Sequence, residues 1–166
     1  MTGRREELRA GLDAVRGRID AACAAAGRDP AEVTLVVVTK FFPRTDVDVL
    51  HELGVRDVGE NRDQEAAEKL DPRDRPADLT VHFIGQLQSN KAGSVASYAD
   101  VVHSIDRPKL VPALERGAHR AGRRLAGLVQ VNLDEDAAAG RGGAAELAWT
   151  DRAGSAPPSA ARRSRR

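Results

Sequence analysis

The run from Val33 to Lys40 constrains the fold of this chain more than any other stretch. It reads Val-Thr-Leu-Val-Val-Val-Thr-Lys and is followed by two phenylalanines and Pro43. A short, uninterrupted run of β-branched residues and leucine is typical of a strand that is buried on both faces of a sheet. Because side chains alternate along a strand, Lys40 shares a face with Val38. The run therefore predicts a fully buried strand over residues 33–40 that delivers one lysine to its carboxyl end.

A lysine at that position has two interpretations. In the first, apolar surroundings favour the neutral amine of Lys40, which then attacks a carbonyl carbon and forms a Schiff base. In the second, Lys40 is an ordinary strand-terminal lysine whose ammonium group extends into solvent. The run by itself does not separate these two interpretations.

Helix and strand patterns alternate along the rest of the chain. The apolar spacing at Leu8, Leu12, Val15 and Ile19 predicts an amphipathic helix over residues 4–26. Further helices are expected over 43–53, 62–70, 88–98 and 107–122, and further strands over 55–61, 79–85, 100–105 and 125–133. Strands that alternate with helices of this length indicate βαβ units and a parallel sheet, hence an α/β fold.

Several polar or small residues fall where the predicted strands end. Lys40, Asn61, Gly85 and Ser104 all lie at carboxyl ends, the edge of a parallel α/β sheet that carries the active site. Asn61 is able to orient a bound ring or carbonyl through its amide, or to cap the helix that starts at residue 62. His82 is either a ligand or a hydrogen-bonded core histidine. The stretch 85–91, which includes Lys91, suits an anion, although capping and a solvated lysine explain it equally.

Composition narrows the class of protein. Lysine and arginine total 26 against 25 acidic residues, a balance that argues against the whole chain being a polyanion binder. The single cysteine, Cys23, excludes an internal disulfide and a cysteine metal cluster, and the histidines lack metal-ligand spacing. The charged start is unlike a signal peptide, and no window is apolar enough for a membrane span. We therefore expect a cytoplasmic protein with no metal and no membrane contact.

Taken together, these stretches resemble the pyridoxal 5′-phosphate homeostasis family, also called the YggS or PROSC family. The segments that carry the resemblance are Leu35-Val-Val-Val-Thr-Lys40, Gly59-Glu-Asn61, His82-Phe-Ile-Gly-Gln-Leu-Gln-Ser-Asn-Lys91, His103-Ser-Ile-Asp106 and Val129-Gln-Val-Asn-Leu133. They occur in the family's order and at its separations. The third segment is the most specific, and the resemblance covers about residues 4–143.

The resemblance implies a fold, a cofactor and a site. Members of the family adopt a TIM-like (β/α) barrel similar to the amino-terminal domain of alanine racemase. They hold pyridoxal phosphate as a Schiff base on the lysine that matches Lys40, and Asn61 and His82 would line the cofactor side of the barrel. They are regarded as carriers or regulators of cofactor level without established catalytic turnover, so the implied partners are apo forms of pyridoxal phosphate enzymes.

The carboxyl-terminal part departs from the family pattern. We expect a partial barrel domain of about five βα units over residues 1–143 and a disordered tail rich in Arg, Ala, Pro and Ser over residues 144–166. The family's late phosphate-binding motifs do not occur, as expected for a chain truncated or shifted in reading frame after about residue 143. An open barrel would expose its edges and favour self-association.

Two other functions are compatible with the residues. A racemase-like enzyme would use Lys40 as its base, but it needs a second acid or base, and the sole tyrosine, Tyr98, ends a predicted helix. A non-catalytic scaffold with a basic interaction tail would use the five arginines among residues 151–166. Those arginines lack interleaved aromatic residues, which argues against nucleic-acid binding.

Overall fold

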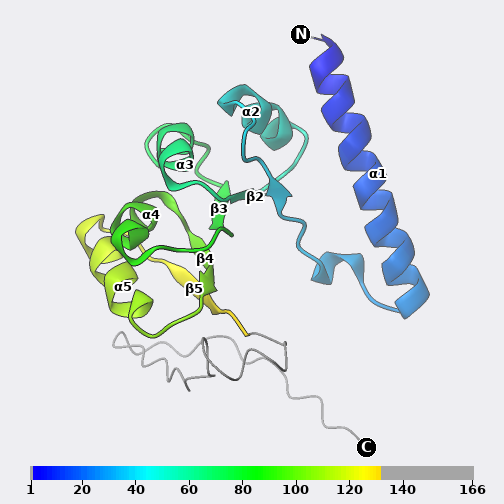
Figure 1. Ribbon diagram of the computed structural model, residues 1–166. Helices are drawn as coiled ribbons and strands as arrows, with labels where there is room; N and C mark the ends of the chain where they lie inside the picture. The colour runs from blue at the N-terminus through cyan, green and yellow to red at the C-terminus, as the bar shows by residue number, and fades with distance from the viewer. Residues whose placement is uncertain (1, 132–166) are drawn as a thin grey trace, which may run out of the picture.

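The computed structural model describes residues 2–131, in which five strands form one parallel sheet in chain order (Figure 1). The strands are β1 (Val37–Val38), β2 (Asp57–Glu60), β3 (Thr80–Phe83), β4 (Val101–Ile105) and β5 (Ala126–Val129). The helices are α1 (Thr2–Ala26), η1 (Pro30–Glu32), α2 (Arg44–Glu52), α3 (Asp63–Lys69), η2 (Ser89–Lys91), α4 (Ala92–Tyr98) and α5 (Leu110–Arg120). Successive βα units in chain order form an incomplete (β/α) barrel, which confirms the predicted fold class.

The register divides the sheet into two faces. Val58 pairs with Val37 and Val81, and Phe83 pairs with Val102. These side chains share one face, and those of β2, β3 and β4 are almost completely buried with residues of α2 to α5 in the hydrophobic core. We call it the helix-covered face, and Figure 1 shows α3, α4 and α5 grouped on one side of the strands.

The opposite face carries Val38, Gly59, His82 and Val101, which are register partners across β1 to β4. Lys40 lies two residues beyond Val38, in the turn that follows β1, and continued alternation predicts it on this same side. We call it the Lys40 face.

The first strand is much shorter and more exposed than predicted. A fully buried strand over residues 33–40 is wrong, because β1 has two residues and the Val38 side chain is 42% exposed. Among the described residues β1 pairs only with β2, so it is an edge strand. An edge strand has hydrogen-bonding partners on one side alone, and its second face receives little cover.

The amino-terminal helix forms where the apolar spacing predicts it, but its stripe is only partly buried. Leu12 and Cys23 are buried, whereas Val15 is 38% exposed. Figure 1 shows α1 standing beside the sheet, beyond β1. An ion pair from Arg4 to Asp46, 2.6 Å long, holds the start of α1 against α2.

The other predicted elements occur within a few residues of their expected bounds. Within residues 2–131 no helix combines the length and the apolar character that crossing a bilayer requires. The expectations for residues 144–166, and for the last part of the first domain, lie outside the described residues.

Candidate cofactor site

The candidate site is built on a turn that follows β1. Thr39 continues the ladder by donating its N–H to the Gly59 carbonyl oxygen at 3.0 Å, and Phe42 closes the turn by donating its N–H to the Thr39 carbonyl oxygen at 3.1 Å. Lys40 and Phe41 are the two central residues of this turn. Lys40 is half-buried, and its Nζ lies 5.8 Å from the centre of the Phe41 ring. Among residues 2–131 its amine makes no ion pair or hydrogen bond, so it is available to a ligand.

Phe41 has a strained backbone. Its φ of 68° lies in the left-handed region, where it is alone among the non-glycine residues that the structure describes. Such a conformation costs of order 1–3 kcal/mol and persists where the surroundings fix it. The ring itself is 63% exposed, and the Arg62 guanidinium stacks 4.5 Å from its centre.

A buried ion pair lies directly beneath the turn, on the helix-covered face. The Lys69 ammonium contacts Glu60 Oε1 at 2.7 Å, and the two side chains are 6% and 0% exposed. The same ammonium donates to the carbonyl oxygens of Thr39, at 2.8 Å, and Phe42, at 3.0 Å. The Thr39 hydroxyl also donates to Glu60 Oε1, at 2.6 Å. Both ends of the turn are thus tied to a buried charge pair.

Glu65 extends this network to the strained residue. Its Oε1 accepts the Phe41 N–H at 2.7 Å and contacts the Lys69 ammonium at 3.3 Å. Burial opposes ionisation of Glu65, but these two hydrogen bonds prevail and lower the pKa of its carboxyl. The carboxylate therefore stays charged and holds the backbone of Phe41.

Asn61 follows β2 at the same edge of the sheet. The capping interpretation of Asn61 is wrong, because α3 begins at Asp63 with Arg62 in the N-cap position and no side-chain cap. The Asn61 Oδ1 atom is buried and has no hydrogen-bond partner among the described residues. A buried amide oxygen without a partner costs free energy and marks a place for a ligand group that donates a hydrogen bond.

Asn61 also lines a pocket of about 340 Å³ at the carboxyl ends of β2 and β3. Amide side chains of three glutamines line it as well, together with Asp63 and Lys91. Lys91 lies 3.5 Å from the Asp63 carboxylate, so its charge is already balanced. That pairing supports the solvated, paired interpretation of Lys91 over an anion site.

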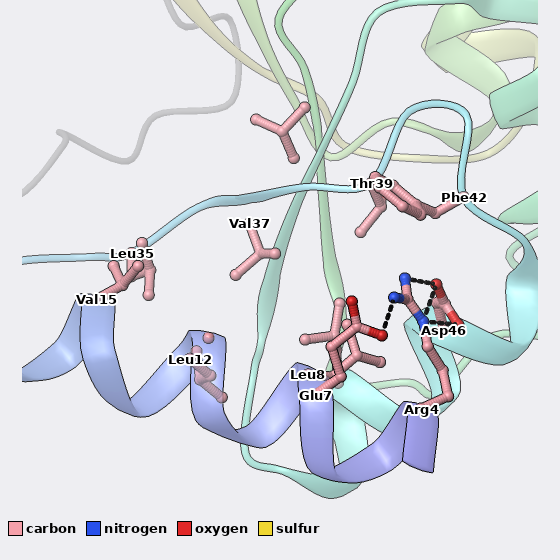
Figure 2. A pocket seen from close by; sticks show the side chains of 13 residues that line it. Arg4, Glu7, Leu8, Leu12, Val15, Leu35, Val37, Thr39, Phe42 and Asp46 are labelled. Atoms are coloured by element: carbon pink, nitrogen blue, oxygen red, sulfur yellow. Dashed lines mark hydrogen bonds and ion pairs between the residues drawn. The ribbon is translucent and has the colours of Figure 1, made fainter. Parts of the chain in front are cut away.

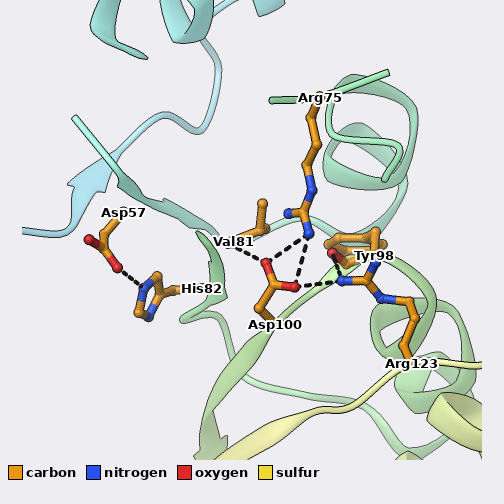
Figure 3. A network of polar contacts seen from close by, with 7 residues as sticks. All are labelled: Asp57, Arg75, Val81, His82, Tyr98, Asp100 and Arg123. Carbon is orange, nitrogen blue, oxygen red and sulfur yellow. Dashed lines mark hydrogen bonds and ion pairs between the residues drawn. The ribbon is translucent and has the colours of Figure 1, made fainter. Parts of the chain in front are cut away.

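His82 lies on the Lys40 face with both ring nitrogens engaged. Its Nε2 is 2.9 Å from Asp57 Oδ1, as Figure 3 shows, and its Nδ1 is 2.9 Å from His103 Nε2. Neutral histidines satisfy this chain if His82 donates to Asp57 and His103 donates to His82. Burial, and then the neighbouring His82, lower the pKa of His103. The arrangement favours the hydrogen-bonded core interpretation of His82 over that of a ligand.

A second cleft, of about 470 Å³, separates α1 from β1 (Figure 2). Leu8 and Leu12 of α1 face Leu35 and Val37 of the extended segment across it. Lys40 is not among its lining residues. Thr39 and Phe42, the two ends of the turn, do line it, so the cleft adjoins the candidate site without reaching Lys40.

Sequence patterns missed the residues that hold the turn. The contact of Glu60 with Lys69 was not predicted, and neither Lys69 nor Thr39 was expected to contribute. One local signal exists, since Lys69 lies between Ala66 of α3 and Leu70 just after it, both fully buried. A lysine on that buried stripe requires an anionic partner.

The fold and the turn define a class of protein, namely an α/β barrel segment that presents an unpaired lysine at the end of its first strand. Comparisons with curated proteins place the chain within that class. It is 43% identical over 152 residues to the pyridoxal phosphate homeostasis protein of Mycobacterium tuberculosis and 35% identical over 127 residues to that of Escherichia coli. The chain belongs to the family of pyridoxal phosphate homeostasis proteins.

Each alignment covers a larger share of this chain than of the relative. The alignment with the Mycobacterium tuberculosis protein includes 82% of this chain but 59% of the relative, and with the Escherichia coli protein 75% and 54%. The chain thus spans little more than half the length of these relatives. No family model matches the sequence.

Solved structures give the same relationship. PipY of Synechococcus elongatus, with pyridoxal phosphate bound, superposes with a TM-score of 0.58 and 36% identity, covering 70% of this chain and 55% of PipY. A crystal structure of a protein from Bifidobacterium adolescentis superposes with a TM-score of 0.71 and 32% identity, covering 86% and 61%.

Proposed function

We propose that this chain binds pyridoxal 5′-phosphate as a Schiff base on Lys40 and acts in cofactor homeostasis in the cytoplasm, with apo enzymes as recipients. The observation that carries the proposal is the half-buried, unpaired Lys40 amine on a turn at the carboxyl edge of the parallel sheet. The family relationship and the cofactor bound to PipY support it.

The residues present fit part of that cofactor. Lys40 supplies the primary amine that its aldehyde requires, and the orphaned Asn61 Oδ1 is an acceptor for a hydroxyl or a protonated ring nitrogen. His82, by contrast, has both nitrogens occupied within the protein. We assign it the role of supporting the Lys40 face, and Lys40 and Asn61 the direct contacts.

Schiff-base formation requires little from the protein beyond correct placement of the Lys40 amine. A bound pyridoxal 5′-phosphate would supply an aldehyde carbon, and Lys40 would supply the primary amine that condenses with it, with release of one water molecule. The turn directs the amine, and its backbone bonds limit the directions open to the side chain. Asn61 holds its amide at the adjoining strand end, fixed by the close approach of Gly85 to its backbone. A carrier needs no further acid or base.

A racemase-like enzyme is less well supported. Its second acid or base would have to be the sole tyrosine, and Tyr98 is 1% exposed within the hydrophobic core. Burial, together with the Asp63 and Glu60 carboxylates, raises the pKa of Tyr98. A tyrosine in that position is not placed to exchange protons with a ligand beside Lys40. The scaffold alternative concerns residues outside the described range.

The decisive experiment is a titration of the 166-residue chain with pyridoxal 5′-phosphate. Absorbance reports binding, and borohydride reduction followed by peptide mapping locates the modified lysine. We expect saturable binding with the label on Lys40, and a loss of at least about tenfold in labelling for Lys40→Ala, because Lys69 and Lys91 are already paired with carboxylates.

Lys109→Ala is the matched control, since Lys109 is an exposed lysine at the start of α5 and is not among the residues that line the Asn61 pocket. We expect it to bind as the parent chain does. Weak labelling spread over many lysines and unchanged by Lys40→Ala would refute the proposed function.

A further inference from the structure

The second buried lysine of the site has a role that the proposed function does not use. Lys69 comes from the end of α3, yet its ammonium lies under the turn that carries Lys40. An ammonium has three N–H donors. Its hydrogen bonds go to the carbonyl oxygens of Thr39 and Phe42 and, at 3.3 Å, to Glu65 Oε1, and it forms an ion pair with Glu60 Oε1 at 2.7 Å. Lys69 is therefore fully engaged and does not compete with Lys40 as a nucleophile.

Hydrogen bonds to Lys69, Glu60 and Glu65 reach every residue of the turn except Lys40. The first residue is held through its carbonyl and hydroxyl, Phe41 through its N–H, and Phe42 through its carbonyl. The backbone of Phe41 sits at a φ of 68°, which an unrestrained phenylalanine rarely adopts. A turn with this geometry requires outside restraints. Glu65, 31% exposed, holds the Phe41 N–H, and the buried Glu60 and Lys69 hold the residues on either side.

We propose that Lys69 is a positioning residue for Lys40. Paired with Glu60 on the helix-covered face, it holds the Thr39–Phe42 turn in the conformation that directs the Lys40 side chain to the opposite face of the sheet. This inference rests on the proposed function of Lys40. It predicts that removing the Lys69–Glu60 pair misdirects the Lys40 amine without touching it chemically.

The test compares the parent chain with Lys69→Met and with the double variant Glu60→Gln/Lys69→Met. The single variant leaves Glu60 buried without its cation and is expected to lose stability. The double variant removes both charges together, so it is the one on which the proposal depends. Asp100→Asn is the matched control, because Asp100 bridges Arg75 and Arg123 beyond the amino end of β4, as Figure 3 shows.

Two measurements report on placement. Hydrogen exchange without cofactor follows the amide of Phe42, whose acceptor is the Thr39 carbonyl that Lys69 holds, and we expect it to exchange at least about tenfold faster in the double variant. Visible circular dichroism of the pyridoxal 5′-phosphate adduct reports whether the bound chromophore is held in one orientation. We expect this signal, and selective labelling of Lys40, to be lost in the double variant and kept in Asp100→Asn.

The outcomes separate the two proposals. If the parent chain labels at Lys40 and the double variant keeps the dichroism, the selectivity and the slow exchange, positioning by Lys69 is overturned and the proposed function stands. If Asp100→Asn loses the signals to the same extent, the effect is one of general stability and the inference also fails. If the parent chain shows no selectivity for Lys40, the proposed function itself fails, whereas the exchange data still decide whether Lys69 holds the turn.

Discussion

At the scale of single residues, the site combines side chains whose polar groups lack partners with side chains whose polar groups are hydrogen-bonded. Lys40 is half-buried and unpaired among the described residues, whereas Lys69 is almost fully buried and bonded to four acceptors. Asn61 leaves a buried oxygen without a partner. In the supporting pair, Glu60 Oε1 is engaged by Lys69 and Thr39, whereas its Oε2 is buried without a partner among the described residues.

Gly85 is the residue that brings β3 against Asn61. A Cβ atom there would lie 2.4 Å from the Asn61 carbonyl oxygen and 2.9 Å from its Cα. We expect Gly85→Ala to lower the free energy of unfolding by about 1–3 kcal/mol, because backbone atoms on both sides must move. Urea unfolding followed by far-UV circular dichroism measures the change.

Gly17→Ala is the control, since nothing lies within 4 Å of a Cβ at that position of α1. Alanine there should stabilise the helix by about 0.5–1 kcal/mol. Equal effects of the two substitutions would show that β3 does not approach Asn61 closely.

At the scale of elements, strands β2, β3 and β4 are joined on the Lys40 face by a polar chain. Asp57, His82 and His103 come from three successive strands and bond in series. Such a chain replaces apolar packing on that face with directed hydrogen bonds, and it works with both histidines neutral. The stability of the folded protein should therefore depend on pH near neutrality.

We expect the folded protein to become less stable to unfolding as pH falls below about 6.5, the ordinary pKa of histidine. The pKa of His103 is lowered in the folded state, by burial first and then by His82. The unfolded chain therefore binds a proton that the folded chain rejects, and protonation favours unfolding down to the folded pKa. Urea midpoints at pH 7.5, 6.5 and 5.5 measure the slope.

His103→Gln keeps a donor for His82 and removes the titrating ring. Its urea midpoint should fall less between pH 7.5 and 5.5 than that of the parent chain. An identical fall in the two proteins would assign the pH dependence to other groups.

At the scale of the whole molecule, the sheet ends in two edges within the described residues. β1 and β5 each pair with one neighbour, and apolar side chains near them are exposed: Val38 by 42%, Leu128 by 49% and Val129 by 52%. Exposed strand edges with apolar side chains pair readily with other chains. Self-association through these edges remains a prediction for this chain.

Sedimentation velocity over a range of concentrations tests that prediction. We expect reversible association that rises with concentration and is reduced several-fold by Leu128→Lys, because a charge on β5 opposes edge pairing. Ala25→Lys adds the same charge at an exposed position of α1, away from the sheet, and should leave association unchanged. A chain that stays monomeric at all concentrations would contradict the prediction.

Local pattern was sufficient for the order of elements and for the lysine. Apolar periodicity predicted the helices, the strands and the parallel sheet, and it placed Lys40 and Asn61 at one edge. The same reasoning predicted β1 to be longer and more buried than it is. A run of valines indicates that a segment favours a strand, but not how many neighbouring strands it pairs with.

The sequence by itself determined the alternation of strands and helices, the position of Lys40 and the family, because these follow from patterns a few residues long. Only the tertiary structure decided what surrounds that lysine. Thr39, Glu60 and Lys69 lie up to 30 residues apart in the chain and meet in one buried network. Such contacts depend on how successive βα units pack, and no short-range pattern encodes that packing.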